Sequence, residues 1–204
     1  MKTYPIMLKL TGHRAVVVGG GPVGLRKVDT LAQAGAEVTL VAPELSGQPP
    51  RGVTVLRRPY APQSVEGAFL VFACTDDAAL NSRIARDARA AGALVNAADQ
   101  PDDCDFHVPA SVCDGDVTVA IGTAGASPAL AGNLKRRLAT ALGPKIGQFA
   151  ALLRDLRGQL RSAEDDLDKR GRIMKDLSSD RTYDLFVASG PEAVRRRFME
   201  LLKS

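Results

Sequence analysis

The chain has 204 residues, a formal net charge of +4 and few aromatic side chains (4%), so its core is expected to consist mainly of Ala, Leu and Val. This length suits one α/β domain with a smaller second unit and excludes two complete nucleotide-binding domains. No run of about 18 apolar residues is present, so we expect no membrane span and a cytoplasmic protein. The three cysteines form no C-x-x-C pair, which argues against a disulfide framework or a structural zinc site.

The N-terminal region predicts a βαβ unit. A β-branched run over 13–18 is followed by a helical pattern over 22–34 and by a second apolar run over 37–41. Gly35 stands where a helix ends in a left-handed cap.

Three more strands and a second helix are expected to complete this domain. The strands are expected at 53–57, 69–74 and 94–97, and Asp76-Asp77 begins a helix that continues over 78–91. The predicted class is α/β, with a Rossmann-type parallel sheet in an NAD-binding domain over 1–112.

The pattern changes after Pro101. Strands at 111–113 and 117–121 flank Asp114-Gly115-Asp116, which predicts a hairpin because Asp-Gly supplies the positive φ angles of a tight turn. Ser127-Pro128 predicts an N-cap and a first helical residue, opening a helix to about Leu142. We therefore expect a hairpin-plus-helix segment over 113–143.

Helical patterns fill the remainder, which predicts a small helical domain over 144–204. Expected breaks lie at Gly158, Gly171 and Gly190-Pro191. Basic residues concentrate in this C-terminal part, and a basic surface there would attract a polyanion.

A glycine turn is the strongest chemical motif. The run Gly19-Gly20-Gly21-Pro22-Val23-Gly24 fits G-x-G-x-x-G between a predicted strand and helix. Gly19 would allow the tight turn, Gly21 would let the backbone approach a diphosphate, and Gly24 would permit close helix-strand packing. Pro22 and Val23 open the helix whose first amides would face the phosphates. The alternative is a glycine-rich structural turn.

Two loops are expected to contact the rest of the dinucleotide. The second strand ends at Val41-Ala42-Pro43-Glu44, where Glu44 either holds the ribose hydroxyls or is a solvated loop carboxylate. No arginine is seen in this stretch before Arg51, which favours NAD over NADP. Thr75 follows a strand and is expected at the carboxyl edge of the sheet, as a cofactor contact, an N-cap of the next helix, or both.

Several segments carry a family resemblance, in the order in which they occur along the chain. They are the glycine turn with Leu25-Arg26-Lys27, the stretch 34–44, Ala73-Cys74-Thr75-Asp76-Asp77 with Asn81, 95–99, 104–110 and 121–128. Together they resemble the precorrin-2 dehydrogenase and sirohydrochlorin ferrochelatase family, strongly over about 1–145 and weakly in the helical tail.

The resemblance implies a function: NAD-dependent oxidation of precorrin-2 to sirohydrochlorin in siroheme biosynthesis, with metal insertion in bifunctional members. Asp99 matches the family's aspartate for both activities, and a carboxylate there can accept the released proton. From the residues alone, a cap of the loop before Gln100-Pro101 is the favoured interpretation of Asp99, and only the family resemblance reverses it. A homodimer joined through 113–143 is also implied.

The tetrapyrrole substrate bears many carboxylates. Thr123, Lys135 and Arg136 are candidate contacts for it, although a hydroxyl in a turn often serves its own backbone and basic residues often form a solvated helix face. His13 and His107 are the only histidines, so we expect no resident metal site, and iron or cobalt would enter as substrate.

One rival class stays open: a Rossmann-type nucleotide-sensing module whose arginine-rich tail recruits a partner. Nucleic acid is not expected as that partner, because the tail lacks interleaved aromatic residues for base stacking.

Overall fold

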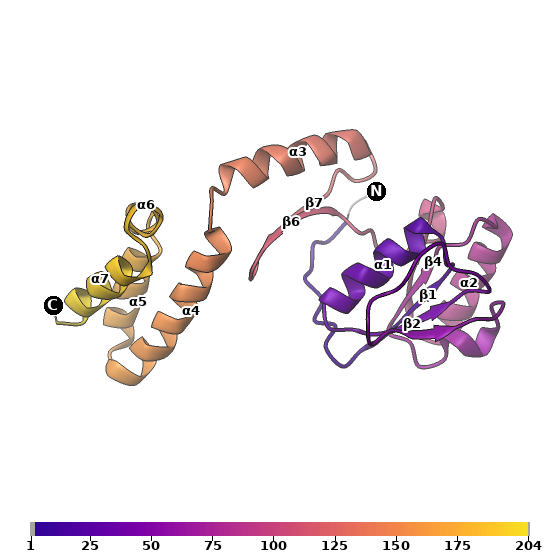
Figure 1. Cartoon of the computed structure of the whole chain (residues 1–204), viewed down its shortest axis with the longest axis horizontal. Helices are drawn as coiled ribbons and strands as arrows, with labels where there is room; N and C mark the ends of the chain where they lie inside the picture. Colours follow the sequence, from indigo (N-terminus) through magenta and orange to yellow (C-terminus); the bar gives the residue numbers. More distant parts are fainter. Residues whose placement is uncertain (1–2, 204) are drawn as a thin grey trace. The chain divides into compact units, whose positions relative to one another are not determined.

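The computed structural model describes residues 3–203, and these form two compact units. One comprises residues 4–108. The other comprises residues 109–203 together with Thr3. Each unit is described by itself below, with elements labelled as in Figure 1.

A parallel five-stranded sheet forms the centre of the first unit, which confirms the predicted α/β class. The strand order is β3-β2-β1-β4-β5, and every pair is parallel. The strands are β1 Arg14–Val18, β2 Glu37–Val41, β3 Thr54–Leu56, β4 Leu70–Ala73 and β5 Leu94–Ala97. Chain order reverses between β1 and β4, and ligands bind at such switch points outside the carboxyl ends of the strands.

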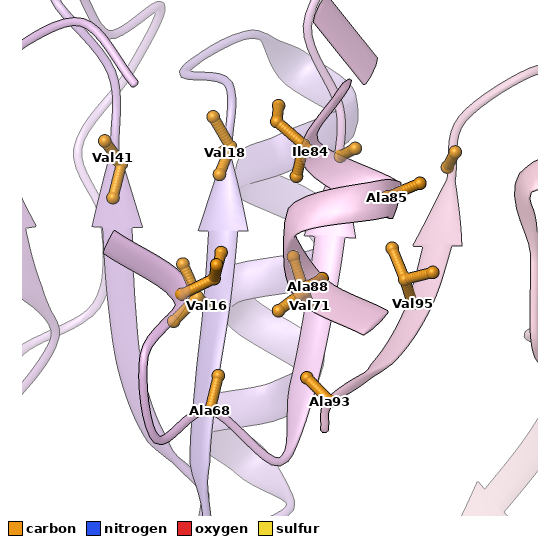
Figure 2. Packing of buried hydrophobic residues seen from close by; sticks show 13 residues of the cluster. Val16, Val18, Val41, Ala68, Val71, Ile84, Ala85, Ala88, Ala93 and Val95 are labelled. Carbon is orange, nitrogen blue, oxygen red and sulfur yellow. The ribbon is translucent and has the colours of Figure 1, made fainter. Parts of the chain in front are cut away.

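The sheet is buried on both faces because two helices cover it. Figure 2 shows Val16, Val71 and Val95 on the face that packs against α2 (Ala78–Ala90). The opposite face packs against α1 (Pro22–Gln33), through side chains that include Val17, Leu40, Val28 and Leu31. Alternation along each strand therefore supplies both cores. Two short 3-10 helices, η1 (Pro62–Val65) and η2 (Pro101–Asp103), lie in the connections.

A two-stranded antiparallel hairpin begins the second unit. It pairs β6 (Ala110–Asp114) with β7 (Val117–Ile121), and its loop is Gly115-Asp116. The predicted hairpin is confirmed, and its first strand extends one residue further than expected, because Asp114 pairs with Val117. Of the Asp114-Gly115 pair, Gly115 alone has a positive φ, of 54°.

Five helices follow the hairpin. They are α3 Pro128–Ala141, α4 Ile146–Ala163, α5 Leu167–Leu177, α6 Asp180–Ser189 and α7 Pro191–Lys203. The predicted start of α3 is confirmed, since the Ser127 hydroxyl accepts from the Leu130 amide at 3.1 Å and Pro128 is the first helical residue.

Two of the expected helix breaks are wrong. Gly158 lies inside α4 and Gly171 inside α5, where an exposed glycine costs only about 1 kcal/mol relative to alanine. The true starts of α5 and α6 are set by Asp166 and Ser179, whose side chains accept hydrogen bonds from amides of the first helical turn.

Helices α4 to α7 share one core, which includes Phe149, Leu156, Leu160, Leu177 and Phe198. The hairpin joins this bundle through Asp114, whose Oδ2 accepts from the Gly147 amide of α4 at 2.9 Å. In contrast, α3 buries only Ala131.

Candidate functional site

The glycine turn between β1 and α1 is dictated by backbone contacts. Gly19 has a φ of 121°, and a Cβ there would overlap the Cys74 carbonyl. A Cβ on Gly24 would overlap the carbonyl of Gly19 itself, so both positions need glycine for packing. These are the roles that the motif predicts for the two residues.

Gly20 is a further required glycine that the motif treats as variable. Its Cβ would overlap the Glu44 carbonyl. The Gly20 carbonyl accepts from both the amide and the hydroxyl of Ser46, at 2.9 and 3.1 Å. The turn is thereby fixed to the loop that follows β2, and no pattern in the sequence signals this contact.

Gly21 differs from its neighbours because a Cβ there would meet nothing within 4 Å. Its φ of −74° is open to any residue, so neither the backbone conformation nor the protein's own packing requires glycine. The open space lies at the N-terminus of α1, where Pro22 has no N–H and the amides of Val23 and Gly24 precede the helical hydrogen bonds. A diphosphate fits this position: the backbone can approach it closely and the helix end favours an anion.

The adenosine end of such a dinucleotide would meet groups of both charges. Pro43 and Glu44 follow β2 as exposed residues. Arg57 and Arg58 follow β3, and Val41 pairs with Leu56, so these arginines lie at the same edge of the sheet. Strand pairing thus brings two arginines, which are distant along the chain, to the sheet edge that carries Glu44.

Thr75 is held firmly in the turn after β4. The Thr75 hydroxyl lies 2.7 Å from Asn81 Oδ1, and the side-chain Nδ2 of Asn81 donates to the Thr75 carbonyl at 3.0 Å. Asn81 is 3% exposed, so this pair fixes the carboxyl edge of β4. The N-cap of α2 is Asp77, which accepts from Ala79 and Leu80, and the alternative that Thr75 caps this helix is wrong.

Asp99 lies just beyond β5 with an exposed side chain and a φ of 59°. The ladder between β4 and β5 continues up to it, because the Ala98 amide donates to the Ala73 carbonyl at 2.8 Å. The chain then folds back onto β5, where Asn96 Nδ2 donates to the Phe106 carbonyl at 2.9 Å. Aspartate tolerates the left-handed region better than most residues, and Ala124 and Lys145 are the other described non-glycine residues with a positive φ.

Cys74 connects Asp99 with the glycine turn. Burial raises the pKa of the Cys74 thiol to about 11, the positive charges of Lys27 and Arg26 oppose this rise, and the negative charge of Asp99 adds to it. All three charges therefore act on one buried thiol at the carboxyl end of β4.

The expected substrate contacts belong to the second unit. The Thr123 hydroxyl donates to the Ser127 carbonyl at 3.4 Å, and Arg136 Nη2 donates to Asn133 Oδ1 at 3.4 Å. Lys135 is exposed on α3. Thr123 thus serves its own turn, and the two cations lie on the solvated surface of the helix.

Within residues 3–203, no group of three or more His, Cys, Asp or Glu side chains is arranged to hold a metal ion. His107 is exposed, and His13 packs against the Phe69 ring at 4.6 Å between centroids. None of the helices described is both long and apolar enough to cross a membrane.

The chain is similar to several siroheme synthases. It is 42% identical to that of Nitrosococcus oceani over 76% of this chain and 35% of the relative, and 35% identical to that of Chromobacterium violaceum over 98% and 43%. That of Methylobacillus flagellatus is 32% identical over 99% and 44%. The chain thus spans less than half the length of these curated relatives.

The fold is also that of a solved structure. SirC, precorrin-2 dehydrogenase, superposes with a TM-score of 0.79 at 24% identity, over 98% of this chain and 99% of the other. The model of the family described as putative NAD(P)-binding matches residues 6–110, which is just over half of the chain and includes the glycine turn, Glu44, Thr75 and Asp99. The chain therefore belongs to this family of putative NAD(P)-binding proteins.

Proposed function

We propose that the chain catalyses the NAD-dependent dehydrogenation of precorrin-2 to sirohydrochlorin, in the biosynthesis of siroheme. The support has three parts: the NAD(P)-binding family, the siroheme synthase relatives, and the segments between the glycine turn and 121–128 that resemble precorrin-2 dehydrogenases. The free thiols Cys74, Cys104 and Cys113 suit a reducing compartment, so a cytoplasmic location is part of the proposal.

One observation carries the proposal more than any other: the placement of Asp99. An exposed carboxylate in a left-handed conformation stands at the carboxyl end of β5, and its charge reaches Cys74 beside the glycine turn. A carboxylate at the carboxyl edge of the sheet would be able to accept a proton from the reaction partner of a bound dinucleotide, which supports the proposal.

The oxidation removes a hydride and a proton from the macrocycle, and bound NAD+ supplies the hydride acceptor. Open space at Gly21 and the free amides of Val23 and Gly24 would receive the diphosphate. Asp99 would accept the proton, giving sirohydrochlorin, NADH and a protonated carboxyl group that releases its proton to water. Thr75, held by Asn81, would border the cofactor.

NAD is the proposed cofactor rather than NADP, because Glu44 would repel a 2′-phosphate and bind ribose hydroxyls. Arg57 is the residue that could reverse this preference. We expect Glu44→Gln to reduce the ratio of kcat/KM for NAD+ to that for NADP+, and Arg57→Gln to increase it. An unchanged ratio in Glu44→Gln would remove Glu44 from cofactor selection.

A homodimer joined through 113–143 is also part of the proposal. Helix α3 leaves Leu130 and Leu138 exposed and buries only Ala131. A two-stranded hairpin is marginally stable by itself, so a second copy would complete this layer. Thr123, Lys135 and Arg136 would then contribute to the tetrapyrrole site. Sedimentation of Leu138→Glu should give monomers where the unmodified chain gives dimers.

The decisive experiment mixes the protein with precorrin-2 and NAD+ and follows the near-ultraviolet absorbance of NADH. We expect NADH and sirohydrochlorin to appear in equal amounts. Tight NAD+ binding with no change in precorrin-2 would instead support the nucleotide-sensing module. Incubation of sirohydrochlorin with iron or cobalt without NAD+ tests separately whether these metals are also substrates.

A further inference from the structure

Lys27 lies on α1, facing the sheet. The residue is half-buried, and its Nζ lies 5.6 Å from the centroid of the Phe72 ring, which belongs to β4. Phe72 in turn meets the Phe106 ring edge-on, with 5.5 Å between centroids. The ammonium group therefore sits over an aromatic surface built from β4 and from the segment that folds back after Asp99.

The direction of the Lys27 side chain follows from the helix. Side chains on an α-helix lean toward its N-terminus, and the N-terminus of α1 is the glycine turn at the carboxyl edge of β1. Burial lowers the pKa of Lys27, whereas the thiols of Cys74 and Cys104 raise it and Arg26 lowers it further. The contact with Phe72 places the ammonium over β4, one residue before the end of that strand.

Lys27 has no carboxylate within ion-pair distance anywhere in the described part of the chain. Lys169, another partly buried lysine, has partners within the protein. Its Nζ lies 3.3 Å from Glu164 Oε2 and 3.2 Å from the Leu202 carbonyl oxygen. A partly desolvated ammonium without a counter-ion costs stability. An anionic ligand at this place would supply the missing counter-ion.

The position of Lys27 indicates whether the anionic ligand is the dinucleotide or its reaction partner. The diphosphate position lies at the helix start, where Val23 and Gly24 supply amides, whereas Lys27 lies over β4. Lys27 lies over Phe72 of β4, and Asp99 follows β5, the strand that pairs with β4, so both residues lie on the carboxyl side of this strand pair. Asp99 must reach the reacting macrocycle in the proposed function. The Lys27 ammonium, on the same side of the strand pair, is therefore expected to reach the macrocycle as well.

We propose that Lys27 binds a peripheral carboxylate of the tetrapyrrole and so orients the macrocycle toward Asp99. This inference rests on the proposed function and adds a substrate-binding residue to it. The contact would be charge-assisted, and the Phe72 ring beneath the ammonium would limit its movement.

The test compares Lys27→Met, which keeps the length and apolar stem, with Lys27→Arg, which keeps the charge. Arg26→Met is the matched control, because it removes an exposed charge from the preceding residue. Binding of sirohydrochlorin without NAD+ is followed by its visible absorbance, binding of NAD+ by calorimetry, and turnover by NADH formation.

We expect Lys27→Met to weaken sirohydrochlorin binding and raise KM for precorrin-2 by about 10- to 100-fold, the effect of losing one hydrogen bond to a charged group. NAD+ affinity should not fall, and Tm should change little, since the lost charge has no counter-ion among the described residues and the methionine side chain keeps the contact with the Phe72 ring. Lys27→Arg should recover most of the affinity, and Arg26→Met should change it less than about threefold.

Two results would overturn the inference: unchanged sirohydrochlorin affinity in Lys27→Met, or a loss of NAD+ affinity in its place. A fall in Tm in both Lys27 variants would assign the residue a structural role and also overturn it. Failure of the proposed function is distinct, because it would appear as an unmodified chain that produces no NADH from precorrin-2.

Discussion

The two units achieve order by different means. In residues 4–108, close backbone contacts decide the structure: Gly19, Gly20 and Gly24 each lie where a Cβ would overlap a carbonyl group. In residues 109–203, the helices depend on capping side chains such as Asp166 and on a core of large side chains. In the second unit one described glycine, Gly147, has such a contact, with the Asp114 carbonyl, so sensitivity to an added Cβ is concentrated in the glycine turn of the first unit.

The helical unit and the carboxyl edge of the sheet also differ in whether their charged side chains form ion pairs. In the helical unit, Asp176 accepts from Arg197 Nε and Nη2, both at 2.7 Å. At the carboxyl edge of the sheet, Glu44, Asp99 and Lys27 form no ion pair with any residue of the range 3–203. Paired charges stabilise the bundle, whereas the unpaired charges of the sheet edge are available to a ligand.

The largest expected effect comes from Asp99→Asn. Asparagine keeps the shape and tolerates a φ of 59°, so the loop should remain intact. The amide cannot accept the proton, and we expect kcat for NADH formation to fall by about 10²- to 10⁴-fold. NAD+ affinity should stay within about threefold of the unmodified protein.

Asp99→Gly is the matched control for backbone strain, since glycine adopts this conformation freely. It should be at least as stable as Asp99→Asn and equally inactive. Normal turnover by either variant would remove Asp99 from the chemistry.

The next largest effect separates two glycines of one turn. Gly24→Ala places a Cβ against the Gly19 carbonyl, which must shift backbone, so we expect a loss of several kcal/mol in the free energy of unfolding, about 3 or more. Gly21→Ala places its Cβ in open space, so Tm should hold while NAD+ affinity falls at least about tenfold. Thermal melts and calorimetry measure the pair.

Full NAD+ affinity in Gly21→Ala would contradict the diphosphate position. If Gly24→Ala instead lost affinity with an unchanged Tm, the turn would be shaped by the ligand and not by packing.

Elements with strong periodic patterns could be predicted from the sequence. The strands 37–41 and 94–97 and the N-cap at Ser127 are observed as expected, because their signals are local. The helix breaks at Gly158 and Gly171 are wrong, since the core of α4 to α7 outweighs the modest cost of a glycine. Tertiary packing determines that these helices continue through the glycines, and a local sequence pattern carries no information about that packing.

Residues of the candidate site likewise divide into those with a local sequence signal and those whose position depends on tertiary structure. The roles of Gly19 and Gly24 follow from a motif with fixed spacing, and the left-handed Gly35 follows from the helix end. The location of Arg57 and Glu44 at one edge of the sheet, and of Lys27 over Phe72, depends on strand order and helix placement. Such juxtapositions across the sheet need three-dimensional information.

A third prediction concerns the bundle. Leu156 is 0% exposed in the shared core of α4 to α7, and Leu156→Ala should cost about 2 to 5 kcal/mol of unfolding free energy. Leu167, which is 75% exposed, is the matched control, and Leu167→Ala should cost less than about 0.5 kcal/mol. Denaturant titrations measure both, and NAD+ binding at low denaturant should be unchanged. Loss of NAD+ binding in Leu156→Ala alone would show that the sheet unit depends on the bundle.

The smallest effect concerns thiol reactivity across the two units. Alkylation requires the thiolate, and burial raises the pKa of Cys74 from 9.0 to about 11, so at pH 8 its thiolate fraction is about 100-fold below that of an ordinary thiol. Exposed Cys113 should react first with iodoacetamide and buried Cys74 last, as mass spectrometry of the peptides would reveal.

The same pKa difference predicts a dependence of stability on pH. The unfolded chain loses the Cys74 proton near pH 9 and the folded chain near pH 11, so this thiol lowers the free energy of unfolding as pH rises through that window. Cys74→Ala removes the titrating group and should flatten this part of the curve, whereas Cys113→Ser should leave it unchanged. A curve of equal slope in Cys74→Ala would mean that the Cys74 thiol is more hydrated than the residue's 8% exposure implies.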